Sequence, residues 1–278
     1  MNTKEKISTK EIITWCPGCP NFMILESVKQ TLSRLIDSGE FKQTDFAVVT
    51  DIGCSSKIYD YLNISGIYGL HGRAIATGVG VKLGNPNLKV LTFSGDGGTY
   101  NEGISHFIHA CRYNADMVSI VHDNQRFSLT TGQATATSQI GYKNKAEPLG
   151  EFNRPLNPLR LALASGASFV ARCNARDIKH TSEILEKAIK HKGFAFVEII
   201  QDCIIFNVDT TNKDKQMYKI EDNSDEEKAE KIASEWDYNS RTGKIALGVI
   251  YKKERPILEK EWPQLKKLTE KKVSWKNK

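Results

Sequence analysis

Short apolar runs alternate with helix-like segments along most of this chain. The runs 89–93 and 117–122 are apolar and rich in β-branched residues, and segment 101–113 between them has helical spacing. Two such runs joined by a helix are typical of parallel strands, because parallel strands need a long crossover connection. The same alternation continues to residue 200 and predicts an α/β fold with a doubly wound, mainly parallel sheet.

The expected elements follow one another along the chain in a regular order. Helices are expected over Asn21–Asp37, 71–83, 101–113, 157–165, Ile178–Lys190 and 225–234. Strands are expected over Phe46–Thr50, 89–93, 117–122, 168–172, 194–200 and 244–251. From Asp209 the chain becomes more charged, so we expect one domain over residues 1–208 and a peripheral C-terminal extension over 209–278. The polar segment 127–146 is typical of a functional or disordered loop, because structureless connections of that length are uncommon.

Polar motifs directly follow two of the predicted strands. Gly95-Asp96-Gly97 closes the first of the two runs, and Asn124 closes the second. Parallel strands end at one edge of a sheet, where open α/β sheets bind ligands. Aspartate and asparagine oxygens suit Mg²⁺, and glycines let the backbone approach a diphosphate. Gly-Asp-Gly also makes ordinary turns, but with an asparagine at this spacing it matches the thiamine-diphosphate signature.

The six cysteines fall into two groups. Two lie in apolar-periodic segments and are expected in the core; these core cysteines are Cys111 and Cys173. Four stand in loop-like contexts; these loop cysteines are Cys16, Cys19, Cys54 and Cys203. Four thiolates can hold a structural zinc or a [4Fe–4S] cluster, and a CxxC pair alone can act in redox chemistry. Beside a thiamine diphosphate site the cluster is favoured, because that cofactor's chemistry can release electrons.

Composition and charge argue against several classes of protein. The chain is 40% hydrophobic and 26% charged, as globular proteins are. It has no apolar stretch long enough to span a membrane, and its N-terminus lacks the apolar core of a secretory signal, so we expect a cytoplasmic protein. The net charge of +6 is spread along the chain, and no aromatic-studded basic stripe favours nucleic-acid binding. The lysine-rich end is expected to be a solvated tail, and its lysines are Lys266, Lys267, Lys271, Lys272, Lys276 and Lys278.

The motifs taken together resemble those of a known family. WCPGC, DIGCS, LHGRA, GDGGTY, DNQRFSLTTGQ and a late single cysteine stand in the order found in β subunits of 2-oxoacid:ferredoxin oxidoreductases. The resemblance covers roughly residues 12–208. It implies CoA-dependent oxidative decarboxylation of a 2-oxoacid, either pyruvate or 2-oxoglutarate. The implied cofactors are thiamine diphosphate, Mg²⁺ and a [4Fe–4S] cluster that passes electrons to ferredoxin.

The resemblance also implies roles for individual residues. The four loop cysteines would ligate the cluster, and Mg²⁺ would be held by Asp96, Asn124 and the backbone carbonyl of Arg126. Lys57 and His71 are expected to be catalytic. The residues expected to bind thiamine diphosphate are Ile52, Gly53, Cys54, Ser55, His71, Gly95, Asp96, Gly97, Gly98, Asn124, Ser128 and Leu129.

Three residues depart from the family pattern. Pro20 replaces the usual glycine after the CxxC, Gly98 stands where some members have a second acidic residue, and Thr131 stands where many broad-specificity members have lysine. Proline stiffens the turn and removes an N–H group that is able to face a cluster sulfur. The other two departures leave the identity of the 2-oxoacid open.

The resemblance further implies a partner subunit. Thiamine enzymes need a second α/β domain to hold the aminopyrimidine ring, and this chain has room for only one such domain. We therefore expect a hetero-oligomer with an α subunit that carries the aminopyrimidine domain. Two alternatives remain: a subunit of another thiamine enzyme, of the indolepyruvate or non-oxidative decarboxylase type, or a zinc-bound, non-catalytic α/β scaffold.

Overall fold

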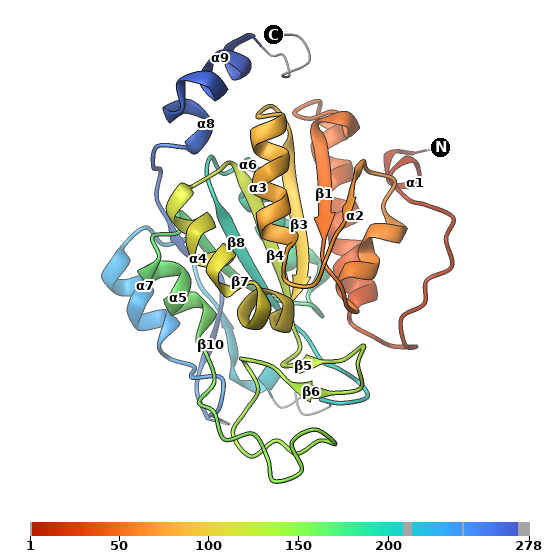
Figure 1. The fold of residues 1–278 in the computed structure, drawn as a ribbon, viewed down its shortest axis with the longest axis vertical. Helices are drawn as coiled ribbons and strands as arrows, with labels where there is room; N and C mark the ends of the chain where they lie inside the picture. The colour runs from red at the N-terminus through yellow and green to blue at the C-terminus, as the bar shows by residue number, and fades with distance from the viewer. Residues whose placement is uncertain (1, 208–212, 241, 272–278) are drawn as a thin grey trace.

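A single twisted sheet organises the molecule. The computed structural model describes residues 2–207, 213–240 and 242–271, and in this part of the chain eight strands form one sheet (Figure 1). All pairings in this sheet are parallel except that of β10 with β7, which confirms the predicted α/β fold with a mainly parallel sheet. In spatial order the strands are β2 (Gly66–Tyr68), β1 (Phe46–Thr50), β3 (Lys89–Gly95), β4 (Met117–Asp123), β8 (Ala195–Ile200), β7 (Phe169–Asn174), β10 (Ile245–Lys252) and β9 (Met217–Lys219).

Helices cover both faces of the sheet. One face carries α1 (Thr3–Lys6), α2 (Asn21–Asp37) and α6 (Ile178–Lys190), and the other carries α3 (Ala74–Gly84), α4 (Ile104–Tyr113), α5 (Pro158–Ala164) and α7 (Glu226–Ala233). Strand β1 shows the alternation: Phe46 and Val48 belong to the core beneath α2 and α6, and Val49 belongs to the core beneath α3 and α4. Successive strand residues point to opposite faces, so apolar runs such as this one are buried on both sides.

Shorter elements complete the fold. The antiparallel pair β5 (Arg126–Phe127) and β6 (Gln133–Ala134) lies in the predicted polar loop. A π-helical turn, η3 (Gly97–Glu102), precedes α4, and two 3₁₀ turns, η1 (Gln43–Asp45) and η2 (Ser56–Tyr61), flank β1. Helices α8 (Leu258–Glu261) and α9 (Pro263–Lys271) follow β10. No helix within the described ranges has the length and apolar character to span a bilayer.

Several elements have the bounds that the apolar periodicity of the sequence predicted. The helices Asn21–Asp37 and Ile178–Lys190 and the strand Phe46–Thr50 have the predicted bounds. The helix expected over 101–113 is instead the turn η3 followed by α4, and the helix expected over 71–83 begins only at Ala74. Both predicted starts lie in glycine-containing segments, where apolar spacing says little about where regular hydrogen bonding begins.

The C-terminal part contributes to the sheet. Strand β10 lies between β7 and β9 and is buried from Ile245 to Tyr251, so the extension expected to be peripheral is partly integrated into the core. Its run is apolar on both faces, with Val249 in one core and Ile250 in the other. The predicted boundary at residue 208 borders a segment outside the described residues, and the division into two units stays a prediction. In the lysine-rich end, α9 includes Lys266, Lys267 and Lys271, whereas Lys272, Lys276 and Lys278 lie outside the described residues.

Candidate functional site

The carboxyl ends of four neighbouring strands meet at one edge of the sheet. Residues 51–54 follow β1, Asp96 follows β3, Asn124 follows β4 and residues 201–203 follow β8. The strand ends are level, because Gly95 pairs with His122 and Asp123 pairs with Ile200. Figure 1 shows β5 and β6 just beyond this edge. Motifs that are far apart in the sequence are therefore neighbours here.

A cavity opens at this edge of the sheet. Its lining includes every residue that the sequence predicted to bind thiamine diphosphate, from residues 52–55 and His71 through residues 95–98 to Asn124 and residues 128–129. Ligands of open α/β sheets bind at such a place, outside the carboxyl ends of the strands. The structure thus brings the predicted residues together, and their role in cofactor binding stays a prediction.

The glycines of this motif are required by close packing as well as by ligand approach. A Cβ atom on Gly97 would lie 2.2 Å from the Phe127 ring, and one on Gly98 would lie 2.0 Å from Asp51 Oδ2. Neither distance is compatible with a side chain unless the neighbour moves. The motif therefore lets η3 pack directly against the segments that follow β1 and β4.

Asp96 and Asn124 both line the cavity. Asp96 is 1% exposed, and burial raises the pKa of its carboxyl to about 6, although hydrogen bonds from the Thr135 and Thr137 hydroxyls oppose the rise. Asn124 Oδ1 accepts a hydrogen bond from the Arg126 backbone N–H at 3.0 Å. A divalent cation beside Asp96 would favour the ionised carboxylate that burial disfavours. This donor set of carboxylate, amide and backbone oxygens fits Mg²⁺.

The thiols of the loop cysteines lie in one neighbourhood. Burial raises the pKa of Cys19 to about 11, and charge on the other three loop cysteines raises it further, which requires that their sulfurs be near. Cys16 is exposed, while Cys203 is 9% exposed and its sulfur accepts the Phe206 N–H at 3.4 Å. Within the described ranges, no three His, Cys, Asp or Glu side chains take up a metal-binding arrangement. Cluster ligation by the loop cysteines therefore stays a prediction, whereas the core cysteines are fully buried as expected.

The two residues predicted to be catalytic have different positions. His71 lines the cavity, and its Nδ1 lies 3.2 Å from Glu102 Oε2. Lys57 is not among the lining residues; its ammonium contacts the Thr14 carbonyl at 3.4 Å, and its charge lowers the pKa of Cys54 against the larger effect of burial. Lys57 thus lies beside a loop cysteine. The catalytic roles of both residues stay predictions.

Two polar residues at this edge, Asp51 and His122, were given no role in the sequence prediction. Burial raises the pKa of Asp51 to about 6, and its carboxylate accepts hydrogen bonds from Ser56 Oγ at 2.6 Å and from Gly72 N–H at 3.2 Å. His122 is held by a 2.9 Å contact between Nδ1 and Asn21 Oδ1, and burial lowers its pKa to about 3, so the ring is neutral. Both residues stand at a strand end, which was the available signal.

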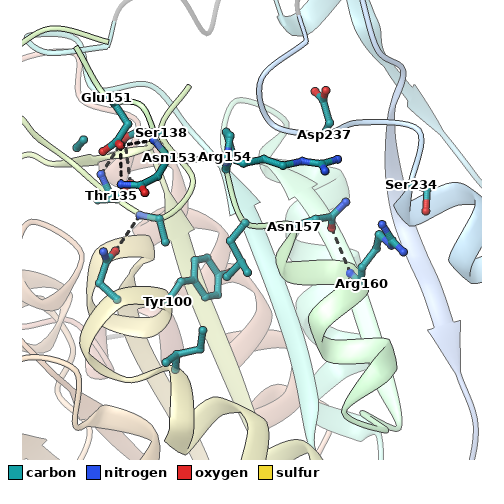
Figure 2. A pocket seen from close by; sticks show the side chains of 16 residues that line it. Tyr100, Thr135, Ser138, Glu151, Asn153, Arg154, Asn157, Arg160, Ser234 and Asp237 are labelled. Carbon is teal, nitrogen blue, oxygen red and sulfur yellow. Dashed lines mark hydrogen bonds between the residues drawn. The ribbon is translucent and has the colours of Figure 1, made fainter. Parts of the chain in front are cut away.

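A second cavity, of about 560 Å³, lies against the turn 135–138 (Figure 2). Tyr100 lines it beside Arg154 and Arg160, and Asn157 Oδ1 accepts the Arg160 N–H at 3.1 Å at the start of α5. Thr135 and Ser138 of the turn also face this cavity, while Thr137 of the same turn contacts Asp96. The turn thus lines the second cavity and also contacts Asp96, which lines the first.

Comparison with known proteins gives consistent results. The family model of the C-terminal TPP-binding domain of thiamine pyrophosphate enzymes matches residues 51–199. A 2-oxoacid:ferredoxin oxidoreductase subunit beta from Saccharolobus solfataricus is 38% identical over 256 residues, which are 86% of this chain and 82% of that protein. The subunit of the same name from Sulfolobus sp is 42% identical over 254 residues, which are 86% of this chain and 82% of that protein.

A solved structure extends the likeness to the whole fold. The 2-oxoglutarate:ferredoxin oxidoreductase from Magnetococcus marinus, with 2-oxoglutarate, coenzyme A and succinyl-CoA bound, superposes with a TM-score of 0.88 at 31% identity. The match covers 99% of this chain and 92% of that one. On these likenesses and the site geometry, the chain belongs to the family of 2-oxoacid:ferredoxin oxidoreductase β subunits, which carry a thiamine pyrophosphate enzyme domain.

Proposed function

We propose that this chain is the thiamine-diphosphate-binding β subunit of a complex that oxidatively decarboxylates a 2-oxoacid, pyruvate or 2-oxoglutarate, with coenzyme A and ferredoxin as co-substrates. The observation that carries the proposal is the meeting of four strand ends at one cavity. Asp96 and Asn124 both line this cavity, and so does Cys54, one of the four loop cysteines. The Magnetococcus protein, which was solved with 2-oxoglutarate, coenzyme A and succinyl-CoA bound, supports the substrate class.

The residues of this chain have separate tasks in the proposal. Asp96, Asn124 and the Arg126 carbonyl would hold Mg²⁺, while Gly97 and Gly98 let η3 pack close to the cavity. The loop cysteines hold the cluster, and the exposed Cys16 places this thiol group at the protein surface, where ferredoxin can approach. When bound, thiamine diphosphate supplies the centre at which the 2-oxoacid loses CO₂, and the cluster accepts single electrons. Cysteines that act as cluster ligands must stay reduced, as they do in the cytoplasm, so a cytoplasmic location is part of the proposal.

A partner subunit is part of the proposal. The described residues form one large α/β sheet, which would hold the diphosphate end of the cofactor, and the aminopyrimidine end needs a second domain. Apolar side chains at the cavity are exposed, with Ile52 at 36% and Leu129 at 46%, and Leu70 nearby in the sequence is 75% exposed. Exposed apolar surface around a site indicates a contact with another protein. We propose that the α subunit covers it.

The test is anaerobic co-expression with a candidate α subunit that carries an aminopyrimidine domain. The purified complex should contain iron and sulfide, absorb near 400 nm, and reduce a low-potential dye when supplied with a 2-oxoacid and CoA. Asp96→Asn should weaken thiamine diphosphate binding by more than about tenfold, because it removes the charge of a proposed metal ligand. A colourless, zinc-containing chain that does not bind the cofactor would overturn the proposal and favour the non-catalytic scaffold.

A further inference from the structure

One buried hydroxyl lies between two buried carboxyl groups at the edge of the sheet. Thr137 Oγ1 is 3.1 Å from Asp96 Oδ2 and 3.0 Å from Asp123 Oδ1, and all three residues are at most 1% exposed. Asp96 follows β3, Asp123 ends β4, and Thr137 comes from the turn after β6. The hydroxyl therefore joins the ends of two neighbouring strands.

The turn that carries Thr137 is fixed to the segment after β4. Gln125 Nε2 donates to the Thr137 carbonyl at 2.6 Å, and Ser138 Oγ donates to the Gln125 carbonyl at 2.5 Å. The Thr135 backbone N–H donates to Ser138 Oγ at 2.8 Å, which closes the turn. Gln125 has a φ of 60°, a left-handed conformation that such surrounding contacts stabilise. Thr137 cannot move far without moving residues 124–126.

We propose that Thr137 is a positioning residue for the metal site, which orients the Asp96 carboxylate relative to Asn124 and the Arg126 carbonyl. The inference rests on the proposed function, because it takes Asp96 to be a metal ligand. The Thr137 hydroxyl contacts Oδ2 of Asp96, and the same carboxylate also receives hydrogen bonds from the Thr135 hydroxyl and the Asn124 backbone N–H. Residues that hydrogen-bond to a metal ligand fix its direction and typically change metal affinity 10- to 100-fold when removed.

The alternative is a purely structural role for Thr137. A threonine fills buried space with its methyl group as well as with its hydroxyl, so loss of affinity in one variant would not separate the two roles. Thr137→Val keeps the shape and removes the hydroxyl, while Thr137→Ser keeps the hydroxyl and removes the methyl. Thr92→Val is the matched control, because Thr92 is a fully buried threonine of β3 whose hydroxyl has only a 3.5 Å contact with the Val118 carbonyl.

The experiment is calorimetric titration of Mg²⁺ in the presence of thiamine diphosphate, on the chain purified with its partner subunit. Thr137→Val should raise the Kd for Mg²⁺ about 10- to 100-fold, whereas Thr137→Ser and Thr92→Val should stay within about threefold of the wild type. Thermal unfolding of the metal-free proteins gives a separate measure of structural damage. If Thr137→Val does not fold, Thr137→Ala takes its place, since it differs from Thr137→Ser by one oxygen atom.

The outcomes separate the two proposals. Wild-type Mg²⁺ affinity in Thr137→Val, or equal loss of affinity in the variants with and without the hydroxyl, would overturn the role of Thr137 and leave the proposed function standing. A wild-type complex that binds neither thiamine diphosphate nor Mg²⁺ would refute the proposed function, and this inference with it.

Discussion

Gly98→Ala tests whether the glycines after Asp96 are required by packing. The added Cβ would lie 2.0 Å from Asp51 Oδ2, so the Asp51 carboxylate must move. This carboxylate is buried and accepts hydrogen bonds from Ser56 Oγ and Gly72 N–H. Overpacking costs about 1–3 kcal/mol, and a buried N–H group left without a partner costs about 1–3 kcal/mol. We expect Gly98→Ala to lower the free energy of unfolding by about 2–6 kcal/mol.

Urea denaturation measures this loss, with midpoint and slope fitted together. Gly80→Ala is the matched control, because a Cβ on Gly80 in α3 meets no atom within 4 Å. Alanine there should stabilise the helix by about 0.5–1 kcal/mol. If the clash with Asp51 is the cause, Gly98→Ala should cost at least about 1 kcal/mol less in an Asp51→Ala background. Additive effects of the two substitutions, or a Gly98→Ala variant as stable as the wild type, would refute the reasoning.

Three further predictions concern the thiols, a buried acid and the partner. Serine at any loop cysteine should deplete iron and sulfide in an anaerobic preparation, whereas serine at either core cysteine should not; iron required by a core cysteine contradicts the assignment. Burial raises the pKa of Asp51 to about 6 in the folded protein. The carboxyl therefore contributes its full stability below about pH 4, where it is protonated in both the folded and the unfolded chain, and this contribution is lost as the pH rises through 6. Asp51→Asn should therefore gain up to about 3 kcal/mol relative to the wild type between pH 4 and 8 in urea unfolding, and a pH-independent difference would contradict this. The chain without its partner should not oxidise 2-oxoacids even with cofactor and cluster bound, because well-oriented binding of reacting groups contributes about 7–11 kcal/mol; full turnover by the single chain would disprove the need for a partner.

The sequence was most informative where a periodic apolar segment ends in a polar motif. Strand β3 with Asp96 and strand β4 with Asn124 could be placed at one sheet edge because both follow short apolar runs. The three-residue strands β2 and β9 carry too little pattern to be recognised. Thr137 stands in a polar loop without periodicity, so its position between Asp96 and Asp123 depends on tertiary packing. The sequence shows that Asp51 follows a strand, but it does not show that the Asp51 carboxylate occupies the position that a Cβ atom on Gly98 would take.

The contacts of Tyr238 link a late part of the chain to residues that are made much earlier. Its carbonyl accepts a hydrogen bond from Gln125 at 3.2 Å, and its hydroxyl contacts the buried pair of Arg172 and Glu198 at 2.6 and 2.8 Å. During translation the Gln125 segment leaves the ribosome well before Tyr238 and β10. A chain that ends near residue 207 therefore lacks the Tyr238 contacts to this buried ion pair and to the Gln125 side chain. We expect such a truncated chain to be less stable than the complete one, because buried polar groups lose hydrogen-bond partners.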